Sequence, residues 1–135
     1  MDLASPDLNY VAAVAGGVAY FALGAVWYTV LFGKRWMALR GMSADDPGAP
    51  PAMMGLTAIG GIVSALVVGA VYEWAGGTGP VDGLVVGLII GAGVVAMESI
   101  KSVVYERAQW ELYAINTAYV VLGYALAGLV YALIT

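Results

Sequence analysis

The residues available for chemistry in this chain are few. The 135 residues include no cysteine and no histidine, and charged residues make up only 10% of them. This composition excludes disulfides, thiol nucleophiles, metal sites built on thiolate or imidazole ligands, and histidine acid–base catalysis. Carboxylates, lysine, tyrosine, serine and threonine remain. We therefore predict no catalytic residue, no metal site and no cofactor.

Glu98 and Lys101 are the charged residues that lie well inside an apolar run. A lone charge within a bilayer costs at least ~2.5 kcal/mol on insertion scales. Lys101 follows Glu98 by three residues, a spacing at which an acid and a following base share one helix face. The two side chains can therefore neutralise each other, and Lys101 can also extend its ammonium to the membrane surface.

Three further residues are expected at a similar depth. Asn116 lies about one helical turn into the last apolar run, and Trp27 and Tyr28 lie about one turn from the end of the first. With Glu98 and Lys101 they form a candidate polar layer within the membrane. In one interpretation the ion pair and hydrogen bonds from Asn116 fix the register of the helices. In the other, the layer lines a cavity where Glu98 binds a cation, a proton or a polar headgroup.

Four long apolar runs must position these side chains: residues 8–32, 53–74, 81–105 and 112–134. Each can cross a hydrocarbon core of ~30 Å as a helix that rises 1.5 Å per residue. The chain is 62% hydrophobic. We predict an all-α integral membrane four-helix bundle, a single domain over residues 1–135, in the lipid bilayer of the cell membrane. No basic patch suggests a nucleic-acid partner.

The short loops carry a consistent charge asymmetry. Lys34, Arg35 and Arg40 follow the first run, and Arg107 lies between the third and fourth. The loop over residues 75–80 has no basic residue. Because loops rich in Lys and Arg stay in the cytoplasm, this pattern predicts that the N-terminus and the C-terminus both lie on the outer side.

Aromatic residues fall near both predicted membrane boundaries. Trp27, Tyr28 and Trp110 lie near the cytoplasmic boundary, and Trp74 and Tyr131 lie near the outer one. Trp and Tyr are enriched at these depths because their rings are amphipathic. We interpret all five side chains first as interfacial anchors.

Small residues recur at helical spacing within the runs. The helix-packing glycines predicted from this pattern are Gly61, Gly69, Gly83, Gly87 and Gly91. Stripes of small residues let helix backbones approach closely in lipid, where the hydrophobic effect does not drive association. These stripes are more numerous than one four-helix bundle requires, which favours a homo-oligomer.

Three functional hypotheses follow from these features. The first is a non-enzymatic structural or accessory membrane subunit that self-associates or joins a larger complex. The alternative is a small oligomeric transporter or channel for protons, cations or a small polar solute, working through the polar layer. An enzyme acting on a lipid or isoprenoid is the least favoured, because the chain offers one carboxylate well inside a run and no histidine or cysteine.

Two stretches of sequence carry a family resemblance. The first comprises Asn9, Gly24-Ala25-Val26-Trp27-Tyr28, Leu31-Phe32-Gly33-Lys34 and Trp36; the second comprises Tyr105-Glu106-Arg107 and Leu112-Tyr113-Ala114-Ile115-Asn116-Thr117-Ala118-Tyr119. The chain resembles the DUF1761 family of small bacterial and archaeal membrane proteins with four predicted spans. Thr29-Val30 stands where a proline often follows the Trp-Tyr pair. The resemblance implies no activity, since the family name records an unknown function. It directs attention to Asn9, Trp27, Tyr28, Phe32, Gly33, Lys34, Trp36 and Asn116.

Overall fold

The computed structural model describes residues 2–135, and this part of the chain contains helices and no strand. In chain order the elements are α1 (Tyr10–Val26), η1 (Trp27–Leu31), α2 (Gly33–Leu39), α3 (Pro51–Trp74), α4 (Pro80–Ile90), η2 (Gly91–Ala96), α5 (Met97–Ser99), α6 (Lys101–Val104) and α7 (Trp110–Ile134). Four continuous segments are long and apolar enough to span a membrane: Tyr10–Leu31, Pro51–Trp74, Pro80–Val104 and Trp110–Ile134. The prediction of an all-α protein with four such helices is confirmed.

Local sequence signals explain where the long helices begin and end. The Asn9 side chain caps α1 by accepting a hydrogen bond from the Ala12 backbone N–H at 3.0 Å. Pro51 and Pro80 occupy the first turns of α3 and α4, where a missing N–H has no consequence. Gly76, with φ of 72°, ends α3, and the next N–H returns to the carbonyl of Tyr72 at 2.9 Å.

Two π-helical turns interrupt the first and third spans. In η1 the Phe32 N–H bonds to the carbonyl of Trp27, five residues back, at 2.8 Å. Gly33 follows because a Cβ there would lie 2.6 Å from the Tyr28 carbonyl oxygen. Such turns widen a helix by one residue and change the direction in which the following side chains point. After η1 the chain changes direction and α2 begins at Gly33. The second π-helical turn, η2, comes just before the helix that contains Glu98.

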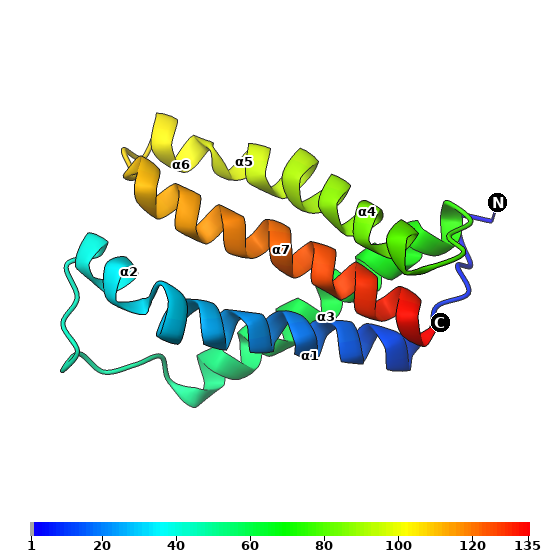
Figure 1. Cartoon of the computed structure of the whole chain (residues 1–135), viewed down its shortest axis with the longest axis horizontal. Helices are drawn as coiled ribbons and strands as arrows, with labels where there is room; N and C mark the ends of the chain where they lie inside the picture. Colours follow the sequence, from blue (N-terminus) through cyan, green and yellow to red (C-terminus); the bar gives the residue numbers. More distant parts are fainter. Residues whose placement is uncertain (1) are drawn as a thin grey trace.

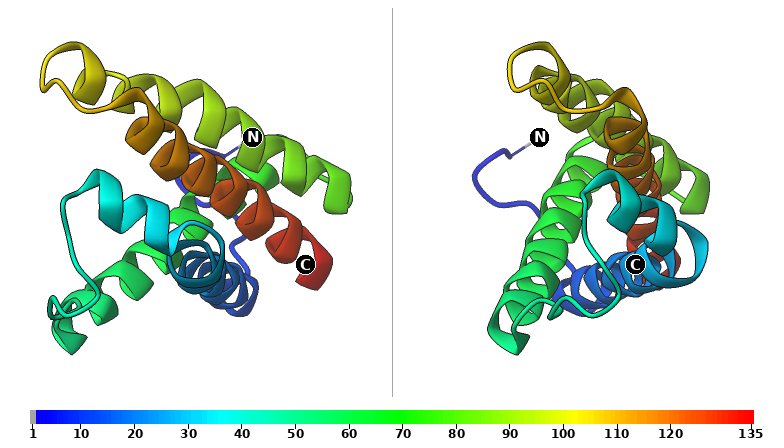
Figure 2. Two further views of the ribbon diagram at one scale, coloured as in Figure 1. Left: turned by 60° about the vertical axis from the view of Figure 1, so that its left-hand side comes forward. Right: turned by 90° about the vertical axis from the view of Figure 1, so that its left-hand side faces the viewer.

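The last helix, α7, is the centre of the bundle. It packs against α4, α1 and α3, whereas α3 packs mainly on α1 (Figure 1). In all the views of Figures 1 and 2, the start of α3 lies well away from the start of α7. Residues 51–60 of α3 are therefore exposed except for the half-buried Ala58, while Ala65 and Val68 are fully buried. The bundle is tight at one end and splayed at the other.

The glycines predicted to pack helices all lie against other parts of this chain. A Cβ at Gly83 or Gly87 would lie 2.1 Å from a backbone oxygen of α7. At Gly69 it would lie 2.4 Å from the Tyr131 ring. Gly61 faces the Gly17 carbonyl oxygen of α1 at 3.1 Å, and Gly91 faces Val121 of α7 at 3.0 Å. These close approaches hold the four spans of one chain together.

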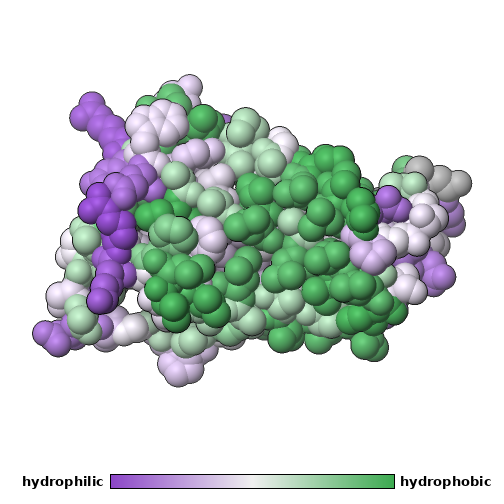
Figure 3. Space-filling view, viewed as in Figure 1, coloured by the Kyte–Doolittle hydropathy of each residue, from purple (hydrophilic) through white to green (hydrophobic). Residues whose placement is uncertain are grey.

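Charge divides the molecule into two ends. The basic end, formed by α2 and the α6–α7 turn, carries every lysine and arginine: Lys34, Arg35, Arg40, Lys101 and Arg107. The acidic end, formed by the termini and the α3–α4 turn, carries Asp2, Asp7, Glu73 and Asp82 and no basic side chain. On the face drawn in Figure 3, a broad apolar belt separates polar surface at the two ends.

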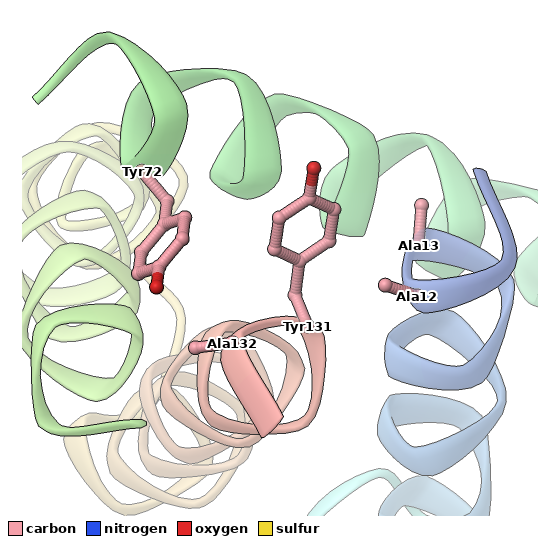
Figure 4. Packing of buried hydrophobic residues seen from close by; sticks show 5 residues of the cluster. All are labelled: Ala12, Ala13, Tyr72, Tyr131 and Ala132. Carbon is pink, nitrogen blue, oxygen red and sulfur yellow. The ribbon is translucent and has the colours of Figure 1, made fainter. Parts of the chain in front are cut away.

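The tightest part of the core lies toward the acidic end. Tyr131 is fully buried; it points from α7 toward α3, while Tyr72 points from α3 toward α7 (Figure 4). Their ring centroids are 5.8 Å apart in an edge-on arrangement. Ala12, Ala13 and Ala132 complete the cluster. The interpretation of Tyr131 as an interfacial anchor is therefore wrong, because its ring is enclosed by helices.

Candidate functional site

At the basic end, one amide side chain joins three elements. The Asn116 Oδ1 atom of α7 accepts a hydrogen bond from the Tyr28 hydroxyl of η1 at 2.8 Å. It accepts a second from the Trp36 Nε1–H of α2 at 3.1 Å. An indole N–H can only donate, so this contact fixes which side of the amide carries the oxygen. The amide nitrogen of Asn116 consequently points away from both aromatic donors.

Aromatic rings surround this amide. Tyr28 makes edge-on contacts with Trp36 and Tyr119, at centroid distances of 5.5 and 5.2 Å. Trp27, only 7% exposed, donates its indole N–H to the carbonyl of Ile115 at 3.0 Å, and its ring lies tilted against Phe32 with the centroids 4.6 Å apart. Trp27 is therefore a buried link between η1 and α7, and the interfacial-anchor interpretation is wrong for it too.

An exposed ion pair, between Arg35 and Glu111, also joins α2 to α7 at this end of the molecule. The Arg35 guanidinium contacts both carboxylate oxygens of Glu111, each at 2.5 Å. This two-point contact has the fork geometry that makes arginine pairs directional. The hydrogen bond from Arg35 to Glu111 raises the pKa of the guanidinium above its ordinary value. The pair therefore keeps its charge and orients α2 over the start of α7.

Glu98 and Lys101 form an ion pair on the other side of α7. Their side chains are 68% and 61% exposed, so neither is enclosed by this chain. Glu98 lies eighteen residues after Pro80, about 27 Å along the helix at 1.5 Å per residue. With a ~30 Å hydrocarbon core, this places the pair close to the boundary with the headgroups. Within residues 2–135, no hydrogen bond joins Asn116 to either member of the pair.

The Glu98–Lys101 pair and Asn116 nevertheless border one cavity. We call it the polar groove; it has a volume of about 560 Å³ and lies between α5, α6 and α7. The polar side chains on which its chemistry depends are Arg40, Glu98, Lys101, Ser102, Glu106, Asn116 and Thr117. Trp27 and Tyr28 do not line it. The structure thus brings Glu98, Lys101 and Asn116 to one groove and leaves the two aromatic residues behind Asn116.

A second cavity opens between α1 and α3, where the bundle splays. We call it the apolar groove; it has a volume of about 620 Å³. Small residues from both helices form part of its wall, including Gly24, Ala25, Gly60 and Gly61. A Cβ at Gly60 would have no heavy atom within 4 Å. Gly60 therefore borders space that this chain does not fill, whereas the added Cβ of Gly61 would meet the Gly17 carbonyl oxygen.

A hydrogen-bond relay at the acidic end was not predicted from the sequence. The Tyr131 hydroxyl donates to Glu73 at 3.2 Å and accepts from the Asn9 backbone N–H at 3.0 Å. It thus links the start of α1 to the end of α3 through α7. The spacing of these residues along the chain gives no signal of the contact, since 122 positions separate Asn9 from Tyr131.

Comparison with known proteins identifies a family. Residues 11–132 match the family described as "Protein of unknown function (DUF1761)". The chain belongs to the DUF1761 family. No curated protein and no solved structure matches it. In this DUF1761 protein most of the residues highlighted by the family resemblance lie at the basic end, where η1, α2 and α7 join: Trp27, Tyr28, Phe32, Gly33, Trp36 and Asn116. Lys34 lies in α2 at the same end, whereas Asn9 caps α1 at the acidic end.

Proposed function

We propose that this DUF1761 protein is a non-enzymatic membrane subunit that self-associates, with a second copy of the chain packed in the apolar groove. The observation that carries the proposal is the groove itself: the two helices diverge and leave small residues facing lipid. In a bilayer, helix contacts are enriched in such residues because they allow close backbone approach and many van der Waals contacts. The exposed first turns of α3 are the segment best placed to enter the groove of a partner.

The predicted packing glycines do not support an oligomer, because other parts of the same chain lie against them. Gly83, Gly87 and Gly69 are filled by neighbours within the chain. Gly60 differs because its surroundings are open and because it borders the apolar groove. The proposal therefore rests on the space between α1 and α3, and not on the number of glycines in the sequence.

Replacing Gly60 with leucine tests the proposal. The new side chain fills the groove and should convert the dimer to a monomer, as measured by light scattering of protein purified in mild detergent. Gly93→Leu is the matched control, since a Cβ at Gly93 also has no heavy atom within 4 Å but Gly93 does not line the groove. A monomeric parent protein, or equal loss of dimer in both variants, would contradict the proposal.

Cross-linking gives a second measurement, because the native chain has no cysteine. Thr57 lines the apolar groove and Val94 is 60% exposed in η2. A short bis-maleimide should link two copies of Thr57→Cys in membranes and leave Val94→Cys unlinked. The reverse pattern would place the contact between copies on another face.

The geometry gives less support to a transporter or channel formed by one copy. The polar groove reaches Val120, and beyond it toward the acidic end α4 lies directly against α7. Gly83 and Gly87 mark this contact, where a Cβ would overlap backbone atoms. A solute path would therefore have to run between copies. The proposed orientation follows from charge: we place the basic end in the cytoplasm and both termini outside.

A further inference from the structure

The polar groove combines opposite charges with free hydrogen-bond donors. Arg40 and Lys101 supply two cations on its lining, and Glu98 and Glu106 supply two anions. The formal charge of the lining is therefore balanced, and a ligand with a large net charge of either sign gains little from it. A zwitterion can meet both signs at once.

Uncharged polar groups lie beside these charges. Asn116 has its oxygen occupied by Tyr28 and Trp36, which leaves its amide N–H groups for the groove. The hydroxyls of Ser102 and Thr117 also line the groove, and neither makes a hydrogen bond within residues 2–135. The half-buried Asn116 and Thr117 require a polar partner where they face hydrocarbon, because hydrocarbon provides none.

The lining changes in character with depth. Along α7 it passes from Leu112 and Tyr113, through Asn116 and Thr117, to the apolar Val120. The Glu98–Lys101 pair lies near the headgroup boundary, so Val120 faces the hydrocarbon. A phospholipid changes in the same order. Its charged headgroup would meet the charged side chains, its ester groups the uncharged donors, and its acyl chains the aliphatic surface.

We propose that the polar groove binds one zwitterionic phospholipid with a primary ammonium, of the phosphatidylethanolamine type. The phosphate lies between Lys101 and Arg40, where charge-assisted hydrogen bonds are available. The ammonium donates to Glu98 and Glu106, which a quaternary choline ammonium cannot do because it carries no N–H. Thr117 and the Asn116 amide donate to the ester oxygens. This site is separate from the apolar groove.

Native mass spectrometry of the detergent-purified protein tests the assignment. Phosphatidylethanolamine, phosphatidylcholine and phosphatidylglycerol with identical acyl chains are titrated in turn. We expect one retained phosphatidylethanolamine per chain, bound about tenfold more tightly than the other two. Equal retention of the three lipids overturns the proposal. So does equally tight binding of soluble phosphoethanolamine, because the acyl chains would then contribute nothing.

Variants locate the bound lipid. Lys101→Gln should weaken phosphatidylethanolamine binding about tenfold, and Thr117→Val should weaken it without removing a charge. Lys34→Gln is the matched control, since Lys34 lies at the same end but outside the groove. Unchanged binding in correctly folded Thr117→Val and Glu98→Gln protein overturns the location, as does equal loss in Lys34→Gln. Light scattering on the same samples separates loss of lipid from loss of the dimer.

Discussion

At the scale of single residues, Asn116 concentrates the hydrogen bonding of the basic end. Its oxygen accepts from two donors in different elements, and its side chain lines the polar groove. In a membrane protein, such side-chain contacts stabilise helix association by about 0.6 kcal/mol on average and up to about 1.7 kcal/mol. The amide makes two of them and so joins η1 and α2 to α7.

We predict that Asn116→Leu lowers the free energy of unfolding by about 1 to 2 kcal/mol, because Tyr28 and Trp36 both lose their acceptor. Unfolding by sodium dodecyl sulfate in mixed micelles measures the change. Thr117→Val is the control, since its hydroxyl has no partner within the described chain. Equal stability of the Asn116→Leu and Thr117→Val proteins would show that the amide contacts carry no net energy. A double-mutant cycle with Tyr28→Phe isolates the first hydrogen bond.

The sequence predicts how deep a side chain lies in the bilayer, but not whether it points to lipid or to a neighbouring helix. Position within an apolar run placed Asn116, Glu98 and Lys101 near one depth, and the structure brings them to one groove. The same reasoning assigned Trp27 and Tyr131 to the membrane interface, where both rings are instead buried. Hydropathy gives the height of a side chain along the bilayer normal. Whether it points to lipid or to a neighbouring helix depends on packing with distant parts of the chain.

At the scale of elements, the contact between α4 and α7 sets how closely the spans can pack. Gly83 and Gly128 face each other, and a Cβ added to either would lie 2.0 to 2.1 Å from the carbonyl oxygen of the other. Gly87 approaches the Tyr124 carbonyl in the same way. No side chain fits between the two backbones, so this helix pair depends on glycine.

Gly87→Ala should destabilise the protein by about 1 to 3 kcal/mol, because overpacking forces the two backbones apart. Gly93→Ala has open space around its new methyl group and should be neutral or slightly stabilising, since alanine favours a helix. Thermal unfolding in detergent, followed by circular dichroism, compares the two variants. If both alanine variants unfold at the same temperature, the close approach of α4 and α7 is not a source of stability.

Most of the elements could be predicted, and the reason is local. Length and apolarity identify four spans, while Pro51, Pro80 and Gly76 mark ends through backbone restrictions that need no tertiary partner. The π-helical turns η1 and η2 could not be predicted in this way. An extra residue in a helical turn is retained when contacts with other elements favour it, such as those of Trp27 and Tyr28 with α7.

At the scale of the whole molecule, charge is distributed along the axis of the bundle. The basic end carries every lysine and arginine, and the charged side chains of the acidic end are all acidic. Short basic loops resist translocation, so the two ends should face different compartments. The orientation in the membrane depends on the entire chain, because the side on which one loop lies determines the side of every other loop.

Single cysteines in the cysteine-free chain can report this orientation. Gly48→Cys lies in the exposed loop of the basic end, and Ser5→Cys lies in the exposed N-terminal segment. A membrane-impermeant maleimide added to intact cells should label Ser5→Cys and spare Gly48→Cys until the membrane is opened. Labelling of Gly48→Cys in intact cells would reverse the proposed orientation, and labelling of both would indicate a mixed population.

The central position of α7 has a consequence for biogenesis. Domains form from the N-terminus during synthesis, yet α4 packs mainly on α7, which is made after it, and α1 packs on α7 about as much as on α3. The first three spans must therefore wait in the bilayer with the glycine face of α4 uncovered. A nascent chain stopped before residue 110 would expose that face, which is the kind of surface that membrane quality control can distinguish from a finished bundle.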